Sequence, residues 1–277
     1  MRSKLFVPAI RPELFAKAMA SAADAVSFDL EDAVPPQRKA EGRAQLSAFL
    51  REVRASGKTV IVRINAPGTL EFEADLAALA GLPIELINLP KVESPDIVRD
   101  AAERIARDWP TATPRLLLNI ESARGLRLAA ELASAHPCVA GLQLGLGDLF
   151  ERDAIHRNEG ANVHAALFAL RMAAAEAGVF AYDSAWGDIE DEAGFRAEAT
   201  MARRLGYLGK SCIHPRQVEA ANAIFSPSDE EIVAARRIVA AAAVAGAQGQ
   251  GAFLVDGRMI DAPYLRRAQA IVAAADA

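Results

Sequence analysis

Eight short apolar segments recur along this 277-residue chain, and longer segments with helical character separate them. The apolar segments, which we expect to be strands, are residues 4–8, 25–30, 59–64, 84–89, 115–120, 139–144, 179–182 and 207–213. The expected helices are residues 12–23, 36–55, 71–79, 95–109, 123–135, 158–177 and 190–205. Strands that are apolar almost throughout fit burial on both faces, as parallel sheets require. The alternation predicts an α/β fold, a (β/α)8 TIM barrel.

An open, doubly wound sheet is the competing arrangement. It is disfavoured because no G-x-G-x-x-G motif follows the first expected strand. A chain of this length with 52% hydrophobic residues can bury one large core, which also suits a barrel.

The strand and helix pattern changes after His214. A capping-box sequence at residues 228–231 predicts a further helix, the Asp-Gly pair at 256–257 predicts a hairpin turn, and a last helix follows. We therefore expect a catalytic barrel over residues 1–225 and a helix–hairpin–helix segment over residues 226–277. This segment is expected to be a lid over the barrel mouth or an arm that contributes to a neighbouring subunit's site, with a purely stabilising cap as the alternative.

Charge and cysteine usage narrow the class of protein. The net charge of −5 offers no basic stripe for nucleic acid, and no uncharged run reaches about 18 residues, so we expect neither a nucleic-acid nor a membrane partner. Charged residues interrupt any apolar run at the N-terminus, which favours a cytoplasmic protein. Cys138 and Cys212 lack metal or redox spacing and are expected to be buried free thiols.

Polar side chains stand at almost every expected strand end. They are Arg11, Asp29, Glu31, Asp32, Arg63, Asn65, Lys91, Glu121, Asp148, Asp183 and His214. Because the carboxyl ends of parallel strands meet at one rim of a barrel, we expect these side chains to converge there. Carboxylates and a cation at one rim are what metal-assisted carbon chemistry needs.

Eight motifs in this order resemble the HpcH/HpaI aldolase and citrate lyase β-subunit family, in particular its malyl-CoA, citramalyl-CoA and citryl-thioester lyases. The motifs are RSKLFVP at 2–8, DLEDAV at 29–34, VRIN at 62–65, LPKVE at 89–93, IES at 120–122, GDL at 147–149, IHP at 213–215 and VDGRMID at 255–261. The chain departs from the family at Ala9, where glycine is usual, and at Gly145-Leu146-Gly147, where Phe-Gly is commoner.

The resemblance implies that Glu121 and Asp148 ligate Mg²⁺, with Mn²⁺ as an alternative, while water and substrate oxygens complete the coordination. Magnesium commonly takes one or two protein carboxylates in such sites, which agrees with this assignment. Taken alone, Glu121 also reads as an acid at a helix N-terminus and Asp148 as a turn aspartate.

The implied reaction is that of an oxo-acid lyase, which cleaves a 3-hydroxyacyl thioester into an acetyl thioester and a 2-keto acid. Arg63 would hold the keto acid's oxygens and stabilise the alkoxide, with Glu31 and Asp32 orienting Arg63 and metal-bound water. Asp261, often entering an adjacent subunit's site in this family, would protonate the enolate carbon. The alternatives are a salt bridge for Arg63 and a helix cap for Asp261.

The thioester partner is coenzyme A or an acyl carrier protein, and the keto acid is glyoxylate, pyruvate or oxaloacetate, with citramalyl-CoA as the first expectation. Coenzyme A contacts are expected among Arg2, Lys4, Arg11 and Lys39, for which solvated surface charge is an equal alternative. An arm that carries Asp261 would require a homo-oligomer, a trimer by family resemblance.

Three other functions remain open. One is a Schiff-base aldolase that uses Lys91, although nearby acids oppose the lowered pKa that this needs. The second is a malyl-CoA thioesterase on the same site, and the third is a barrel that binds a thioester or dicarboxylate without catalysis.

Overall fold

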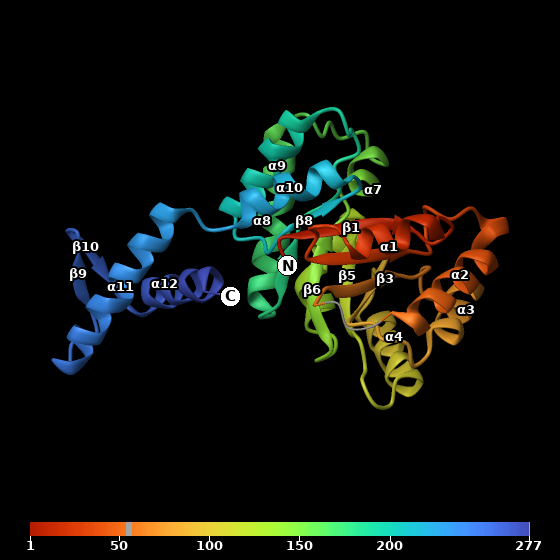
Figure 1. Ribbon diagram of the computed structural model, residues 1–277, viewed down its shortest axis with the longest axis horizontal. Coiled ribbons are helices and arrows are strands. Elements are labelled where there is room, and N and C mark those ends of the chain that lie inside the picture. Colours follow the sequence, from red (N-terminus) through yellow and green to blue (C-terminus); the bar gives the residue numbers. More distant parts are fainter. Residues whose placement is uncertain (54–56, 277) are drawn as a thin grey trace. The chain divides into compact units, whose positions relative to one another are not determined.

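The computed structural model describes residues 1–53 and 57–276. Eight parallel strands form one sheet in the order β7-β6-β5-β4-β3-β2-β1-β8 (Figure 1). A parallel bridge between Asp183 and Lys210 joins the two ends of the sheet, so the strands close into a barrel. The strands are β1 Ser3–Pro8, β2 Ala25–Asp29, β3 Thr59–Arg63, β4 Leu86–Leu89, β5 Arg115–Ile120, β6 Val139–Leu144, β7 Phe180–Tyr182 and β8 Lys210–Cys212. The predicted (β/α)8 barrel is confirmed.

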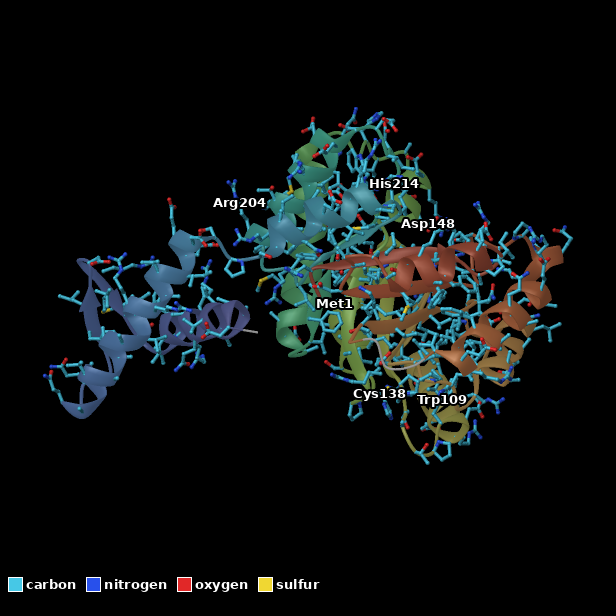
Figure 2. All side chains as sticks on the ribbon, viewed as in Figure 1. Met1, Trp109, Cys138, Asp148, Arg204 and His214 are labelled. Carbon is cyan, nitrogen blue, oxygen red and sulfur yellow. The ribbon has the colours of Figure 1, made fainter. Side chains whose placement is uncertain are left out.

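The strand register brings the predicted strand ends to one level. Asp29 pairs with Pro8 on one side and with Arg63 on the other. Farther round the sheet, Ile120 pairs with Leu144. Asp148 and His214 lie toward this carboxyl end, whereas Cys138, which precedes β6, lies at the opposite end (Figure 2).

Helices cover the outside of the barrel. They are η1 Pro12–Leu14, α1 Phe15–Met19, η2 Pro36–Arg38, α2 Lys39–Glu52, α3 Leu70–Leu79, α4 Pro95–Asp108, α5 Ala123–Arg127, α6 Ala129–Ala133, α7 Leu146–Glu151, α8 Gly160–Glu176, α9 Glu192–Arg204 and α10 Pro215–Phe225. Side chains between these helices and the sheet form one apolar core, in which Phe15, Phe28 and Phe49 pack with ring centroids 5.0 to 5.7 Å apart. This core holds the strand ends in place.

The observed helices differ from the expected ones in four places. Two of them, 12–23 and 123–135, are broken into shorter turns, and the expected end of the helix 36–55 lies outside the described residues. Helices α7 and α10 were not expected. The glycines around Leu146 disfavour a helix by propensity. No helix was assigned between His214 and the expected break at residues 225–228, although proline, as at Pro215, is common in a first helical turn.

The interior of the barrel is polar where apolar packing was expected. Lys4, Asn88, Asn119 and Gln143 are all buried. Gln143 Oε1 accepts hydrogen bonds from Lys4 Nζ and, at 3.2 Å, from Asn88 Nδ2. Strands β1 and β6 are not neighbours in the sheet, so the contact between Lys4 and Gln143 crosses the barrel.

The described chain divides into two compact units, Met1–Phe225 and Ser226–Ala277. The second unit contains α11 Asp229–Ala247, a hairpin of β9 Phe253–Val255 and β10 Arg258–Ile260, and α12 Ala262–Ala275. The predicted capping box is confirmed, because Ser228 and Glu231 each bond the other's backbone N–H. The predicted Asp-Gly turn is also confirmed, with φ of 50° at Asp256 and 77° at Gly257. Within the described ranges, no helix combines the length and apolarity that a membrane span needs.

Candidate active site

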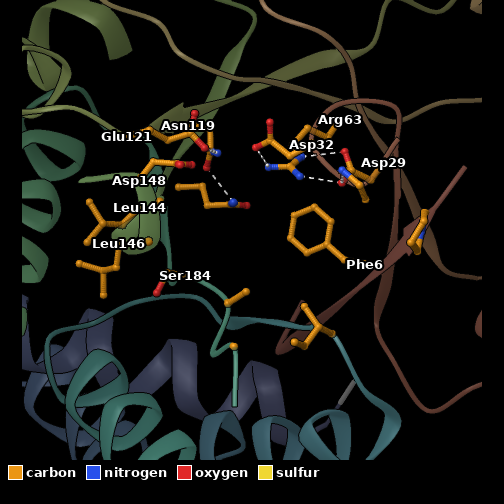
Figure 3. Close-up of a pocket in the computed structure, with 18 of the residues that line it drawn as sticks. Phe6, Asp29, Asp32, Arg63, Asn119, Glu121, Leu144, Leu146, Asp148 and Ser184 are labelled. Atoms are coloured by element: carbon orange, nitrogen blue, oxygen red, sulfur yellow. Dashed lines mark hydrogen bonds and ion pairs between the residues drawn. The ribbon is translucent and has the colours of Figure 1, made fainter. Parts of the chain in front are cut away.

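A cavity of about 570 Å³ opens at the carboxyl ends of the strands. The predicted residues Arg63, Glu121 and Asp148 all line it, together with Asp29 and Asp32 (Figure 3). The structure therefore brings the arginine and the two carboxylates to one mouth, as their positions at separate strand ends predicted.

Arg63 is held mainly by Asp29. Its Nε and Nη2 donate to the two carboxylate oxygens of Asp29 at 2.8 and 2.6 Å. Its Nη1 lies 3.0 Å from Glu31 and 3.8 Å from Asp32. Burial alone would lower the pKa of Arg63, but the hydrogen bonds that it donates to Asp29 raise the pKa above its usual value, so the guanidinium stays charged. The sequence suggested a salt bridge of Arg63 to Glu31 or Asp32 as the alternative, and both contacts are present, but the part of Asp29 in holding Arg63 was not foreseen.

Asp29 also shapes the loop that follows β2. Its carboxylate accepts the backbone N–H of Glu31 at 2.9 Å and that of Ala33 at 3.3 Å. These bonds fold the chain back over the strand end. Glu31 is thereby directed at Arg63, as expected of a residue that orients it.

Lys91 is paired with acids rather than poised as a nucleophile. Its Nζ lies 2.7 Å from Glu31 and 3.3 Å from Asp32. Burial would lower the pKa of Lys91, but Glu31 and then Asp32 more than offset this and raise it above its usual value. An amine held protonated cannot attack a carbonyl, so the geometry opposes the Schiff-base alternative.

The backbone of Lys91 contributes directly to the site. Its φ of 55° lies in the left-handed region, which is uncommon for a residue with a side chain. In this conformation its N–H donates to Glu121 Oε2 at 3.1 Å. The strained turn after β4 therefore fixes one oxygen of Glu121.

A chain of hydrogen bonds through the barrel fixes the other oxygen. Asn119 Nδ2 donates to Glu121 Oε1, and Gln143 Nε2 donates to Asn119 Oδ1 at 2.7 Å. Gln143 Oε1 in turn accepts from Lys4 Nζ and Asn88 Nδ2, and these contacts orient the amides of Gln143 and Asn119. The sequence analysis missed Asn119 and Gln143, although a polar residue inside an otherwise apolar strand was a usable signal.

Gly145 leaves room for Glu121. A Cβ at Gly145 would lie 2.5 Å from Glu121 Cγ, a distance that real contacts do not show. The position of the Glu121 carboxylate therefore requires glycine at residue 145. This residue belongs to the segment Gly145-Leu146-Gly147, which departs from the family's commoner Phe-Gly.

The donor set fits a divalent cation. Burial, followed by the negative charge of Glu31, raises the pKa of Glu121 to about 8; Asp148 adds to this and Arg63 opposes it. A cation between the two carboxylates would relieve that repulsion. Within residues 1–53 and 57–276 no cluster of three or more Asp, Glu, His or Cys side chains could hold a metal. A site with two carboxylates suits Mg²⁺, which keeps its remaining coordination positions for water and substrate.

The four expected coenzyme A residues do not gather at the cavity. Arg2 donates to Asp24 at the amino end of the barrel, at 2.9 Å from Nη2, and Lys4 is buried inside it. All three donors of Lys39 are used, at 2.7 Å each, by Leu30 O, Glu31 O and Asn65 Oδ1. This corrects the expectation for Arg2, Lys4 and Lys39. Arg11, exposed after β1, pairs with Glu13, and its assignment to coenzyme A stays a prediction.

Asp261 and His214 were also singled out by the sequence. Asp261 stands at the start of α12 but makes no side-chain capping bond, so the capping alternative is wrong. Its Oδ1 is buried without a hydrogen-bond partner in the described chain. His214 Nδ1 accepts the N–H of Arg216 at 3.3 Å, as a loop histidine bonded to backbone would.

Comparison with known proteins assigns the chain to a family. The family model for HpcH/HpaI aldolase/citrate lyase matches residues 2–215. The chain belongs to this family. It is 33% identical to citrate lyase subunit beta of Leuconostoc mesenteroides subsp. cremoris, over 100% of this chain and 93% of the relative. It is 37% identical to (3S)-malyl-CoA thioesterase of Cereibacter sphaeroides, over 100% and 95%.

A solved structure of a family member supports the fold over the whole chain. CitE from Mycobacterium tuberculosis, in complex with magnesium, acetoacetate and coenzyme A, superposes with a TM-score of 0.81. The two chains are 33% identical and each is covered completely. The likeness includes the TIM barrel that the strand pattern predicts.

Replacing Gly145 by alanine tests whether Glu121 binds the metal. We expect Gly145→Ala to displace Glu121 and weaken Mg²⁺ or Mn²⁺ binding by at least about tenfold, as measured by calorimetry. Gly147→Ala is the matched control, because a Cβ there meets nothing within 4 Å. Metal affinity within about twofold of wild type in Gly145→Ala would contradict the assignment.

The raised pKa of Glu121 predicts pH-dependent metal binding. Below its pKa of about 8 the metal-free carboxyl is protonated, and the cation must displace that proton. Affinity for Mg²⁺ should therefore rise about tenfold per pH unit between roughly pH 6 and 7.5 and level off above about pH 8. Calorimetry at pH 7 in buffers of different ionisation enthalpy should show proton release. A flat affinity profile without proton release would refute this.

Proposed function

We propose that this protein is a Mg²⁺-dependent carbon–carbon lyase that cleaves a 3-hydroxyacyl thioester into an acetyl thioester and a 2-keto acid. The observation that carries the proposal is the meeting of Glu121, Asp148 and a charged Arg63 in one cavity. Citrate lyase subunit beta among the relatives, and CitE with magnesium and coenzyme A among the structures, support it.

Glu121 and Asp148 would hold the metal, which when bound polarises the substrate's hydroxyl and carboxylate oxygens. The substrate hydroxyl passes its proton to solvent water in the open cavity, the bond between its carbon and the thioester α-carbon breaks, and the electron pair passes to the thioester as an enolate. Arg63 stabilises the negative charge on the oxygen that becomes the keto group. Asp29 fixes Arg63 in that orientation, and Glu31 supports it.

The enolate carbon must then receive a proton. We assign this step to Asp261, one of whose oxygens has no protein partner in the described chain. The second unit would deliver Asp261 to the cavity of a neighbouring copy, which makes a homo-oligomer, a trimer by family resemblance, part of the proposal. Arg11 is the candidate contact for a coenzyme A phosphate, or for the corresponding acyl carrier handle.

Thioester hydrolysis is the second candidate function. The identity to (3S)-malyl-CoA thioesterase, over the full length of this chain, favours it. The same cavity would bind the same substrate, but water would attack the thioester carbon to release malate and coenzyme A.

Product analysis separates these functions. The full-length protein is incubated with malyl-CoA, citramalyl-CoA and citryl-CoA, and the products are separated by chromatography. The lyase gives acetyl-CoA and a keto acid, whereas the thioesterase gives free coenzyme A and the hydroxy acid. We expect EDTA to abolish activity and Mg²⁺ or Mn²⁺ to restore it. Activity that survives EDTA together with borohydride trapping at Lys91 would refute the metal-dependent mechanism.

Replacing Asp261 by asparagine tests the proton donor. We expect Asp261→Asn to lower kcat by about 10²–10⁴-fold while Mg²⁺ affinity stays unchanged. Asp256→Asn is the matched control, because Asp256 is an exposed hairpin residue whose left-handed φ asparagine tolerates. An Asp261→Asn enzyme with full lyase activity would exclude Asp261 as the acid.

A further inference from the structure

A second arginine lines the cavity. Arg157 lies between α7 and α8, and together with Arg63 it makes up the cations of the cavity wall among the described residues. Neither the strand-end pattern nor the motifs pointed to it. The proposed lyase chemistry gives it no role so far.

The guanidinium of Arg157 is held along one edge only. Its Nε donates to Glu198 Oε2 at 3.0 Å, and its Nη2 donates to Glu198 Oε1 at 2.6 Å. Nη2 also donates to Ser184 Oγ at 3.0 Å and to Ala185 O at 2.7 Å. The ring of Trp186 packs against the guanidinium, 4.9 Å from its centroid.

The remaining nitrogen is free to bind a ligand. Nη1 makes no hydrogen bond to the described residues and is not buried, and it carries two N–H donors. The Arg157 side chain as a whole is 21% exposed. A fixed guanidinium with an open pair of donors on a cavity wall is an anion-binding group.

A buried cluster of charged side chains lies behind Arg157. Glu198 also pairs with Lys210 at 2.6 Å, and Lys210 pairs with Asp183 at 2.7 Å. Two cations thus share two acids. Because the side chains of Lys210, Asp183 and Glu198 are at most 4% exposed, this charge-balanced cluster fixes Arg157 in place, and its Nη1 donors stay open at the cavity.

Arg157 lies on a different wall from Arg63. Ser184, its hydrogen-bond partner, lies beside the Leu146 side of the cavity, away from Arg63 (Figure 3). A 2-keto acid whose keto and carboxylate oxygens reach the cation that Glu121 and Asp148 would hold points its third substituent elsewhere in the cavity. That substituent is hydrogen in glyoxylate, methyl in pyruvate and carboxymethyl in oxaloacetate. Only the last can use an open pair of charged donors.

The carboxylates that line the cavity disfavour a second substrate carboxylate unless a further cation binds it. Asp29, Asp32, Glu121 and Asp148 all line the cavity and would repel a second substrate carboxylate. A dicarboxylic keto acid therefore needs a cation beyond the metal and Arg63, both of which the proposed function assigns to the reacting oxygens.

We propose that Arg157 binds a second carboxylate of the keto acid, so that the site selects a dicarboxylic 2-keto acid and the corresponding citryl-type thioester. This inference rests on the proposed lyase function. It replaces citramalyl-CoA, the first expectation from the sequence, by a substrate with one more carboxylate.

Direct binding of the keto acids tests the proposal. Full-length protein loaded with Mg²⁺ is titrated by calorimetry with freshly dissolved oxaloacetate and with pyruvate. Arg157→Gln should weaken oxaloacetate binding by at least about tenfold and leave pyruvate binding within about twofold. Arg157→Lys, which keeps the charge but loses the fork of donors, should give a smaller loss for oxaloacetate. Arg196→Gln, on the exposed face of α9, is the matched control and should bind both as wild type does.

Each outcome distinguishes a role of Arg157 in selecting the keto acid from a purely structural role of this side chain. Equal weakening for both keto acids, or no weakening for either, would overturn the proposal. Thermal unfolding of each variant establishes that it is folded, and Arg157→Lys carries the test if Arg157→Gln does not fold. If the wild type binds oxaloacetate and pyruvate but the Arg157 variants do not weaken oxaloacetate binding selectively, only this inference fails. If the wild type binds neither, the proposed function fails as well.

Discussion

The ion pair between Arg63 and Asp29 is the interaction on which the rest of the site depends. It joins the ends of β2 and β3 through two hydrogen bonds of 2.8 and 2.6 Å. Asp29 also accepts two backbone N–H groups of the next loop, which directs Glu31 at Arg63 and Lys91. Removing Arg63 would leave the buried carboxylate of Asp29 without its cationic partner, at a cost of about 3–5 kcal/mol. The same pair that orients the arginine thus stabilises the barrel mouth.

The buried polar side chains inside the barrel orient Glu121, much as Asp29 orients Arg63. A chain from Lys4 through Gln143 and Asn119 reaches Glu121, and every link is buried. Burial lowers the pKa of Lys4 well below its usual value, which shows how strongly this position disfavours charge. An apolar core would avoid this cost. What the network provides is orientation, because partners behind a metal ligand set its direction and affinity.

The architecture and the converging strand ends could be read from the sequence because both follow from periodicity. Apolar strands of fixed length predict a parallel sheet, and the residue after each strand must then lie at the rim, as Glu121 does. The partners of those residues could not be read in the same way. Asp29 pairs with Arg63 only through the register of β2 with β3, and Arg157 lies in an irregular segment with no periodicity. The same limit applies to Lys39, whose position after β2 resembled that of a surface cation until its three buried partners were located.

The central claim is that Glu121 and Asp148 hold one divalent ion together. A crystal structure of the protein with Mg²⁺ and a bound keto acid tests this most directly. The account predicts one ion within about 2.0–2.1 Å of an oxygen from each carboxylate, with keto-acid oxygens and water in its other positions. An ion bound elsewhere, or two carboxylates that point apart with no density between them, would contradict it.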